Sequence, residues 1–491
     1  MKKKLLDCSN YGKLMVLIGF LVAIPLLTIL FFPSDKAYFY NFAIPAVISI
    51  LFGLISCFIG KNDNDKVNER FSSMQNSSLT VLFAWIWAIV IGSLPFILSS
   101  QLSVVQSLFE SVSGWTTTGL SVMDVSVTPN IFLFHRSFMQ FCGGLGFVLM
   151  IVMLVLGKQS MNLYNAEGHP DKLMPNLKKT AQTIFIIYNG FLVIGIAAYR
   201  IAGMKLFDSL LHTMCALSTG GFSSKLNSIG EYNSLSIEII TIFLMLIGTT
   251  NFAILLLLIK GKIKQIFHIS ELRFMFVLLL IMIPLFTLSL RNMVFLNTTD
   301  AFRQSFFNVV SALSTTGYST VSYNNMPSFI IGIQILLMLI GGGMGSTAGG
   351  IKMSRIYISL RLAVHNIKKR LFPSRKIDIL YYYKAQGKTQ IDTSLANDTV
   401  GFITCYLLIF IIGTLSIILS AGCTLEEGMF EFASALGTVG LSIGLTGPAT
   451  ANSTLIIEMI GMIFGRLEIF IILLSVYSGI KRIKSKLSKA H

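Results

Sequence analysis

The sequence predicts an all-α integral membrane protein with four pseudo-symmetric units of helix, re-entrant loop and helix, preceded by two extra transmembrane helices. Three observations predict this fold. Apolar residues make up 54% of the 491 residues and only 12% are charged, whereas about a quarter of the residues are charged in a soluble protein. Several apolar runs reach the roughly 20 residues that span a bilayer as a helix. A short motif also recurs four times between such runs.

Ten apolar runs are long enough to be membrane spans. They lie near 13–32, 39–60, 76–98, 131–157, 181–203, 234–260, 271–293, 328–360, 397–421 and 454–480. If the amino terminus is cytoplasmic, the cytoplasmic segments hold 30 of the 38 Lys and Arg residues, the charge bias of a membrane protein. Both termini are then cytoplasmic. The net charge of +16 therefore reflects topology and contact with anionic membrane lipid, and we expect no nucleic-acid partner.

The recurring motif has four copies that align without gaps. They are SVSGWTTTGLSV (111–122), TMCALSTGGFSS (213–224), VVSALSTTGYST (309–320) and FASALGTVGLSI (432–443). Every copy has a threonine and, two residues later, a glycine. The three-residue cores are Thr117, Thr118, Gly119; Thr219, Gly220, Gly221; Thr315, Thr316, Gly317; and Thr438, Val439, Gly440.

About 12 residues of helical character precede each motif, which gives a helix roughly 18 Å long. Such a helix enters the roughly 30 Å hydrocarbon core but cannot cross it, so the chain must turn back. Irregular backbone at that depth is tolerated where protein encloses it or where it lines a wet cavity. Close helix packing would also use small residues, but it gives no reason for one motif in every unit. We therefore predict a central pore with a ring of carbonyl oxygens that replaces the hydration shell of a monovalent cation.

The sequence resembles the Trk/Ktr/HKT superfamily of potassium transporters in four features. These are the four loops, the extra amino-terminal pair of spans, GGGMGSTAGGIK (341–352) and GRLE (465–468). The ten-span layout is most similar to the Trk-type potassium uptake subunit. The resemblance implies potassium uptake, with potassium bound at the twelve core residues and no organic cofactor. In this superfamily, glycine at the key position of all four loops is associated with potassium as the transported ion, and this sequence has glycine at all four. Gly220 and Val439, however, stand where the other two copies have threonine.

The resemblance also implies partners and a domain layout. We expect a homodimer and a cytoplasmic ring of nucleotide-binding regulatory subunits, RCK/TrkA-like, on separate chains. The basic loop 361–388 suits either a docked subunit or a lipid surface. The expected parts are an amino-terminal extension, three pore units, and a fourth pore unit with a basic tail, at 1–73, 74–158, 159–262, 263–370 and 371–491.

The stretch 341–352 interrupts a predicted span. Its six glycines among ten residues should break a helix, at about 1 kcal/mol each relative to Ala, although their GxxxG spacing also suits packed helices. The resemblance implies an intramembrane loop that gates the pore below the filter. The expected gating residues are Gly343, Gly345, Ser346, Thr347, Gly349, Gly350, Lys352 and Arg466. Lys352 could instead anchor the helix at the interface, and Arg466 could instead form a structural ion pair.

Other polar residues suggest further roles. Glu110 and Glu431 lie nine residues before their glycines, where they could brace the loops through backbone N–H groups or simply be solvated. Arg136 is expected near the outer interface, and Asn251 is expected to bond to a neighbouring helix.

Two other functions compete with a channel-like pore. A secondary symporter would couple potassium to sodium or protons, but Arg466 is the one charge expected deep in a span. A membrane enzyme is disfavoured for two reasons. GLSIG (440–444) matches the nucleophile-elbow pattern, but it is part of the fourth copy of the repeated loop. The six histidines do not have the spacing of metal ligands.

Overall fold

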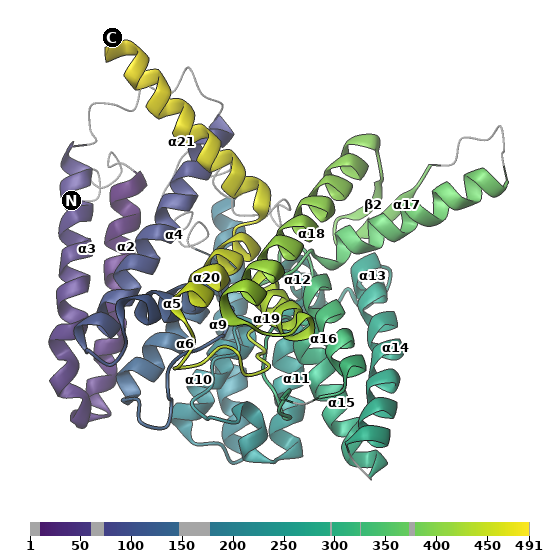
Figure 1. Cartoon of the computed structure of the whole chain (residues 1–491), viewed down its shortest axis with the longest axis horizontal. Coiled ribbons are helices and arrows are strands. Elements are labelled where there is room, and N and C mark those ends of the chain that lie inside the picture. Colours follow the sequence, from purple (N-terminus) through teal and green to yellow (C-terminus); the bar gives the residue numbers. More distant parts are fainter. Residues whose placement is uncertain are drawn as a thin grey trace.

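The computed structural model describes residues 10–59, 73–146, 177–294, 297–324, 326–372 and 379–490. Helices dominate this part of the chain (Figure 1). The prediction of an all-α membrane protein is confirmed, with one small addition in the basic loop 361–388. There, β1 (Tyr381–Lys384) and β2 (Gly387–Gln390) form an antiparallel hairpin in which Tyr381 is paired with Gln390.

The amino-terminal extension is a pair of antiparallel helices. It consists of α2 (Asn10–Ala23), the 3₁₀ helices η1 (Ile24–Leu30) and η2 (Pro33–Tyr38), and α3 (Phe39–Ile59). Ser49 joins this pair to the first unit, because its hydroxyl donates to the Met15 carbonyl at 2.7 Å and accepts from the Trp87 indole at 2.9 Å. The extension is therefore packed against the four-unit body.

Each unit has a long first helix, a short helix that stops at the Thr-x-Gly motif, and a second long segment. Unit 1 has α4 (Ser73–Leu98), α5 (Val104–Trp115) and α6 (Asn130–Leu145). Unit 2 has α9 (Leu177–Ile201), α10 (Leu206–Leu217), η4 (Ser228–Tyr232), α11 (Leu235–Thr249) and α12 (Phe252–Ile259). The short α13 (Ile263–Ile266) follows.

Units 3 and 4 repeat this arrangement. Unit 3 has α14 (Ser270–Met293), α15 (Thr298–Leu313), α16 (Ser328–Ile340) and α17 (Met353–Leu371). Unit 4 has α18 (Thr393–Ala421), α19 (Leu425–Gly437), α20 (Asn452–Arg466) and α21 (Ile469–Ala490). We call α5, α10, α15 and α19 the pore helices.

Local sequence explains where three of the pore helices begin. Ser103 and Gln106 form a capping box at the start of α5, and Thr424 and Glu427 form one at the start of α19. Asn297 caps α15 by accepting from the backbone N–H of Thr299. Such caps satisfy backbone donors that have no partner inside the helix, at about 1 kcal/mol each.

Two of the ten predicted spans, 234–260 and 454–480, consist of two helices joined at a sharp bend. Six described helices are long and apolar enough to span a membrane, and two further spans are bent pairs. The bend is 112° between α11 and α12 and 103° between α20 and α21. The predicted span 328–360 divides into α16 and α17, and residues 147–157 of the predicted span 131–157 lie outside the described residues.

Each break has a local cause. Thr250 is extended and the Asn251 side chain caps α12, accepting from Ala253 N, so Asn251 starts a new helix instead of bonding to a neighbouring one. Glu468 has a left-handed φ of 56° between α20 and α21. Gly341, with φ of 70°, ends α16.

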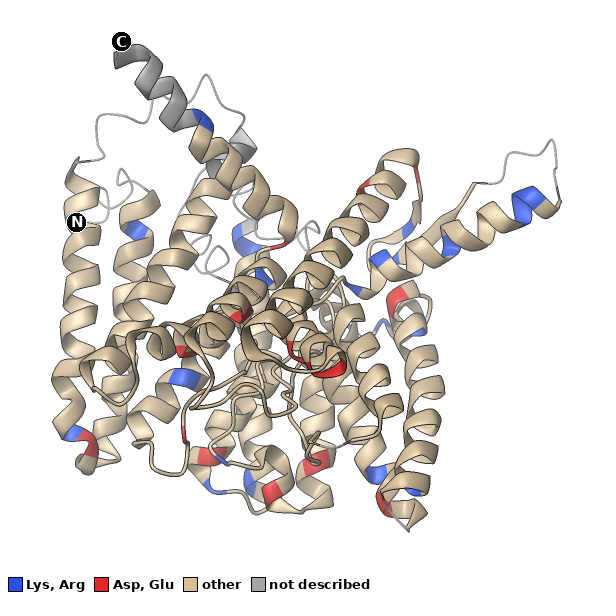
Figure 2. Cartoon of the chain, in the orientation of Figure 1, with Lys and Arg blue, Asp and Glu red and all other residues tan. Residues whose placement is uncertain are grey.

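The surface is apolar where a membrane protein meets lipid. Large apolar residues such as Phe31, Phe58 and Ile201 are exposed, which a soluble fold would avoid in contiguous patches. In Figure 2, the blue residues of α17 and the described part of α21 lie in the upper part of the view, and acidic and basic residues are interspersed at the lower end. Both α17 and α21 extend away from the body of the molecule (Figure 1).

Candidate ion-conduction site

The four loops share an unusual backbone conformation. The threonines Thr117, Thr219, Thr315 and Thr438 have φ of 56°, 53°, 56° and 50°, and the glycines Gly119, Gly221, Gly317 and Gly440 have φ of 95°, 73°, 78° and 94°. The residue between them is not left-handed in any copy. Left-handed backbone costs a non-glycine residue about 1–3 kcal/mol and collects at functional sites. Glycine adopts this backbone without strain, whereas threonine does not.

The four loops form a closed ring. A Cβ placed on each glycine would lie within 3 Å of a carbonyl oxygen in the next loop. Gly119 faces the carbonyl of Gly220, Gly221 faces that of Thr316, Gly317 faces that of Val439, and Gly440 faces that of Thr118. The cycle returns to its start after four units, so the loops converge around one axis. Any side chain at these glycines would strike a neighbouring backbone.

The two departures from the motif are accommodated behind the ring. Thr118 and Thr316 form 2.8 Å hydrogen bonds with the hydroxyls of Thr116 and Ser314. At Gly220, Gln140 of α6 occupies the place of a side chain, donating to the Gly220 carbonyl at 2.6 Å and accepting from Phe222 N at 3.1 Å. In unit 4, Val439 replaces the threonine of unit 1 and Gly437 occupies the position of Thr116. Neither has a side-chain hydroxyl, so unit 4 lacks this hydrogen bond.

One residue of each pore helix braces the segment that follows its glycine. Glu110 accepts from the Ser121 hydroxyl at 2.6 Å and from Val122 N at 2.7 Å. In the same column, His212 bonds to Ser223 at 3.0 Å, Asn308 donates to Thr320 at 2.8 Å, and Glu431 accepts from Ser442 at 2.5 Å. The bracing role considered for Glu110 and Glu431 is present, because both carboxylates are fully buried and accept backbone N–H groups.

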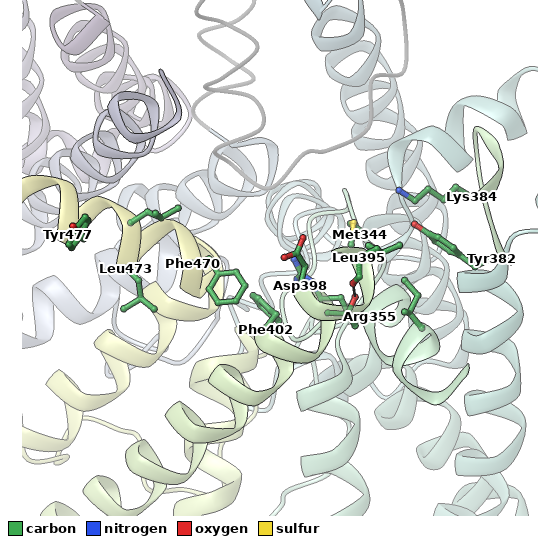
Figure 3. A pocket seen from close by; sticks show the side chains of 13 residues that line it. Met344, Arg355, Tyr382, Lys384, Leu395, Asp398, Phe402, Phe470, Leu473 and Tyr477 are labelled. Carbon is green, nitrogen blue, oxygen red and sulfur yellow. Dashed lines mark hydrogen bonds between the residues drawn. The ribbon is translucent and has the colours of Figure 1, made fainter. Parts of the chain in front are cut away.

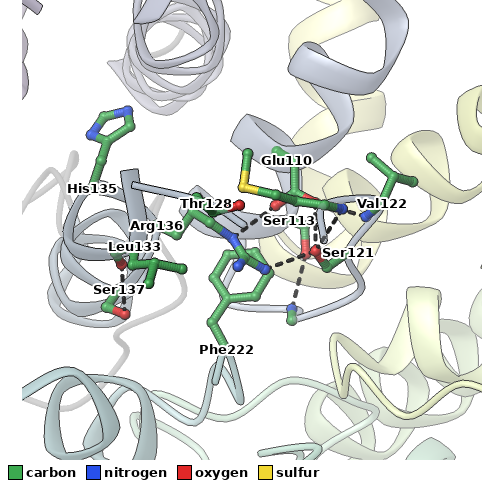
Figure 4. Close-up of polar contacts among 12 residues, drawn as sticks. Glu110, Ser113, Ser121, Val122, Thr128, Leu133, His135, Arg136, Ser137 and Phe222 are labelled. Carbon is green, nitrogen blue, oxygen red and sulfur yellow. Dashed lines mark hydrogen bonds and ion pairs between the residues drawn. The ribbon is translucent and has the colours of Figure 1, made fainter. Parts of the chain in front are cut away.

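Arg136 completes the brace of unit 1 and contacts unit 2 (Figure 4). Its Nε is 3.0 Å from Glu110 Oε2, its Nη2 donates to Ser121 at 2.8 Å, and its guanidinium lies 4.0 Å from the centre of the Phe222 ring. Only 2% of its surface is exposed. Arg136 is therefore buried within the protein, where a carboxylate and an aromatic face compensate for its burial.

The segment 341–352 lies against the base of this ring. The Thr347 hydroxyl oxygen lies 2.9 Å from the Gly248 carbonyl, 3.1 Å from the Leu217 carbonyl and 3.2 Å from the Thr219 hydroxyl, and its one hydrogen can go to either carbonyl. Gly349 N donates to the Thr315 hydroxyl at 2.9 Å. A Cβ on Gly349 would strike the Thr438 hydroxyl. The segment therefore touches the motif threonines of units 2, 3 and 4.

Glycines allow this segment to pack closely. Gly343 N donates to the Thr249 carbonyl at 3.0 Å, and the Gly345 carbonyl accepts from Phe252 N at 3.3 Å. Gly350 has φ of 74° and packs against Gly341. The Ser346 hydroxyl donates back to the Gly343 carbonyl at 2.6 Å. These contacts lie within a non-helical loop, so the alternative of a GxxxG pair in a continuous helix is wrong.

Arg466 joins this loop to unit 1. It donates to the Thr347 carbonyl at 2.5 Å, to Thr117 Oγ1 at 3.3 Å, and to the carbonyls of Gly143 and Gly144.

Glu468 does not pair with Arg466 but with Arg355, at 3.0 Å. The Lys352 ammonium turns back and donates to the Ala348 carbonyl, which is not the geometry of an interfacial anchor. Seven of the eight expected gating residues thus form one loop, and Arg466 contacts it.

Two cavities flank the ring and the loop. One of about 440 Å³ is lined by Gly317, Gly440, Ser442 and residues of η4 and the unit 3 loop. The other, of about 690 Å³, has Met344 of the loop, Arg355 of α17, Phe470 of α21 and Tyr382 of the hairpin in its wall. Figure 3 shows the α21 residues and the hairpin residues on opposite sides of this second cavity.

Three polar residues in the ring's surroundings, Gln140, Arg136 and Glu458, were not predicted to lie there. Each is a polar residue inside an apolar helix, and that signal was visible. Arg136, Glu238 and Glu458 are further charged residues buried in the second segments of their units, each at most 3% exposed. Their partners come from other segments of the chain, and linear spacing does not reveal them.

Comparisons with known proteins identify similar proteins and a similar fold. The TrkH family model, described as a cation transport protein, matches residues 40–479. The Trk system potassium uptake protein TrkH of Vibrio parahaemolyticus is 31% identical over 84% of this chain and 87% of its own length. TrkG of Escherichia coli, of the same system, is 30% identical over 94% of this chain and 96% of its own length. The crystal structure of the Vibrio parahaemolyticus potassium transporter TrkH superposes with a TM-score of 0.82 at 25% identity, covering 96% of this chain and 98% of that one.

Proposed function

This chain belongs to the TrkH family of cation transport proteins, and from that membership we propose that it takes up potassium through a channel-like pore. The protein is a membrane transporter and not an enzyme. The observation that carries the proposal is the closed cycle of four loops, in which each glycine lies against a carbonyl of the next. Relatives named as potassium uptake proteins support potassium as the ion.

The proposed filter consists of the twelve core residues. Their carbonyl oxygens replace the hydration shell of a dehydrated potassium ion. Gly220 and Val439 retain the backbone of the other copies, and their side-chain differences lie behind the ring. We therefore propose that all four loops favour potassium. The membrane potential drives the ion inward, at about 2.3 kcal/mol per charge for each 100 mV.

We propose that residues 341–352 and Arg466 gate the pore. The loop lies against the motif threonines on one side of the ring, and Arg466 adds a fixed positive charge there. Potassium leaving the filter would meet both. Opening then requires the loop to move away from Thr219, Thr315 and Thr438. The other expected gating residues form the backbone of this loop and its end: Gly343, Gly345, Ser346, Gly350 and Lys352.

The proposed partners act on the cytoplasmic side. Cytoplasmic nucleotide-binding subunits on separate chains would engage the hairpin and α17, because the second cavity connects these elements to Met344 of the gating loop. The exposed apolar residues of α17, Leu360, Val364 and Ile367, support a homodimer contact or a lipid contact. Potassium is cargo in this proposal, and the chain needs no organic cofactor.

The remaining proposals concern layout. We assign an amino-terminal extension at 1–73 and pore units at 74–158, 159–262, 263–370 and 371–491. The protein would lie in the cytoplasmic (inner) membrane with both termini in the cytoplasm, as the charge bias indicates. Figure 2 supports this orientation, because the basic residues of α17 and α21 share one end of the molecule.

Flux measurements on purified protein in liposomes test the function. We expect Gly317→Ala to abolish selective potassium flux or reduce it more than tenfold, because a Cβ there would strike the Val439 carbonyl. The matched control is Gly332→Ala, a helical glycine of α16 with no atom within 4 Å of an added Cβ. Potassium-over-sodium selectivity that persists in Gly317→Ala would refute the filter.

A symporter that couples potassium to sodium or protons is the second candidate. Such a protein needs a buried acidic site, and Glu431 and Glu458 are buried beside the fourth loop. Reversal potentials in a planar bilayer separate the two mechanisms. A channel reverses at the potassium equilibrium potential whatever the sodium or proton gradient. A reversal potential that follows a fixed stoichiometry of potassium with sodium or protons would establish coupling, whereas a shift explained by sodium permeability alone would not.

A further inference from the structure

Two buried glutamates share a single hydroxyl group behind the fourth loop. Glu431 of α19 and Glu458 of α20 are both fully buried. The Thr446 hydroxyl lies 3.2 Å from Glu431 Oε2 and 3.0 Å from Glu458 Oε1. A hydroxyl has one hydrogen and can donate to one acceptor at a time. One of these two contacts would therefore join oxygens with no hydrogen between them if both carboxyls were ionised.

Glu431 is surrounded by donors. Its Oε1 accepts from the Ser442 hydroxyl at 2.5 Å, from Ile443 N at 3.0 Å and from Leu445 N at 3.1 Å. With Thr446 at Oε2, the Glu431 carboxylate accepts four hydrogen bonds. Hydrogen bonds of this kind favour the charged form. The negative charge of the pair therefore belongs on Glu431.

Glu458 has the opposite surroundings. Its Oε1 contacts Thr446, and its Oε2 has no hydrogen-bond partner among the described residues although the atom is buried. Burying an ion without adequate partners costs several kcal/mol. A second carboxylate charge next to Glu431 would add repulsion at short range. The surroundings of Glu458 therefore favour its neutral acid form.

We propose that Glu458 is a proton-binding site that holds one proton in the resting protein. The Glu458 carboxyl O–H donates to Thr446 Oγ1, and the Thr446 O–H donates to Glu431 Oε2. This arrangement places one hydrogen in each contact and one negative charge on the pair. The bound ligand is a proton, which differs from the transported ion.

The first unit provides an internal comparison. Arg136 and Glu458 are each the seventh residue of their helix, α6 and α20. Each lies beside the bracing glutamate of its unit, Glu110 or Glu431. In unit 1, Arg136 compensates the glutamate charge. In unit 4, the proton on Glu458 avoids a second charge, and donors in the loop stabilise the first.

The site reaches the cavity beside the ring, because Ser442 both donates to Glu431 and lines that cavity. The titratable groups facing the pair are few among the described residues: Cys423, after α18, interacts electrostatically with Glu431 and with Glu427. From α18, the neutral Ser420 bonds to Thr454 of α20. Loss of the proton would place a second negative charge behind the fourth loop. Any effect of this charge on ion flux rests on the proposed function.

Infrared difference spectroscopy of the full-length protein tests the site. We expect a protonated-carboxyl C=O band in the wild type at neutral pH, shifted in D₂O and lost in Glu458→Gln. The exposed Glu426→Gln should leave the band unchanged. Protein labelled with ¹³C-glutamate must shift the same band, which gives a second readout without substitution.

Three outcomes would overturn the proposal. The Glu458→Gln spectrum could equal that of the wild type, or the labelled wild type could show no glutamic-acid band. A band that disappears when potassium or sodium is added would identify a metal cation as the occupant. The band reports protonation whether or not the protein transports potassium, so its absence and a failure of the flux experiment are distinguishable.

Discussion

At the scale of single residues, the ring depends on groups that stand behind it. Glu110 and Arg136 form a buried pair at 3.0 Å that fixes Ser121 and packs on Phe222 of the next unit. A buried pair contributes little net stability compared with apolar residues. Its removal from one side is costly, because the remaining charge stays buried. The pair therefore acts by holding the unit 1 loop against the unit 2 loop.

Arg136→Gln should destabilise the protein strongly, by about 3–5 kcal/mol, because Glu110 then stays buried without its cation. Thermal unfolding of the detergent-solubilised protein measures this loss. Lys225→Gln is the control, since its ion pair with Glu231 is 3.9 Å long and partly exposed and is worth less than about 1 kcal/mol. Equal melting temperatures for the two variants would contradict the role of the buried pair.

At the scale of elements, the second segments of units 2 and 4 bend close to the ends of neighbouring pore helices. Gly248 of α11 and Gly465 of α20 lie against the carbonyls of Leu217 and Leu436, the ends of the neighbouring pore helices. The bend between α20 and α21 places Arg466 beside Thr117 and Thr347. Breaks in membrane helices are tolerated where other protein groups satisfy the freed backbone.

Gly465→Ala should abolish transport and lower stability by several kcal/mol, because its Cβ would overlap the Leu436 carbonyl and overpacking a core costs about 1–3 kcal/mol or more. Gly190→Ala in α9 is the control, as nothing lies within 4 Å of the added Cβ. Yield of monodisperse protein and potassium flux together report the result. A Gly465→Ala protein with normal flux would show that α20 need not approach the pore helix so closely.

The loop 341–352 should open more readily when the Thr347 hydroxyl, which holds it against unit 2, is removed. Thr347→Val deletes a hydroxyl that bonds to Leu217 and Gly248, and a hydrogen bond is worth about 1 kcal/mol, or roughly a fivefold change in an equilibrium. We expect higher basal potassium flux without cytoplasmic partners. Thr404→Val, which removes a bond to its own exposed helix, should leave flux unchanged. Unchanged or lower flux in Thr347→Val would argue against the loop as a gate.

At the scale of the whole molecule, the charge distribution predicts the orientation in the membrane. Lys225 lies in the loop after the unit 2 filter motif, and Lys369 lies near the end of α17. We expect a cysteine at position 225 to react with an impermeant maleimide added outside intact cells. A cysteine at position 369 should react after the membrane is opened. Both are tested in a variant lacking the six native cysteines, and the reverse pattern would invert the proposed topology.

Much of this arrangement was predictable because it repeats. Four gapless copies identified the pore helices, and α5 at Val104–Trp115 matches the predicted helix before the first motif. Glycine at positive φ was predictable, since only glycine adopts that backbone without strain. The bends of α11/α12 and α20/α21 were not, because apolar composition reports that a segment is in the membrane but not its direction.

By itself, the sequence determined the fold class, the fourfold repeat, the Thr-x-Gly positions and the interrupted stretch 341–352. These are properties of composition and periodicity, which a linear pattern carries in full. Only the tertiary structure decided that Gln140 fills the place beside Gly220, that Arg136 pairs with Glu110, and that Glu431 and Glu458 share Thr446. Those contacts join residues 12 to 80 positions apart, and packing in three dimensions, not spacing along the chain, selects such partners.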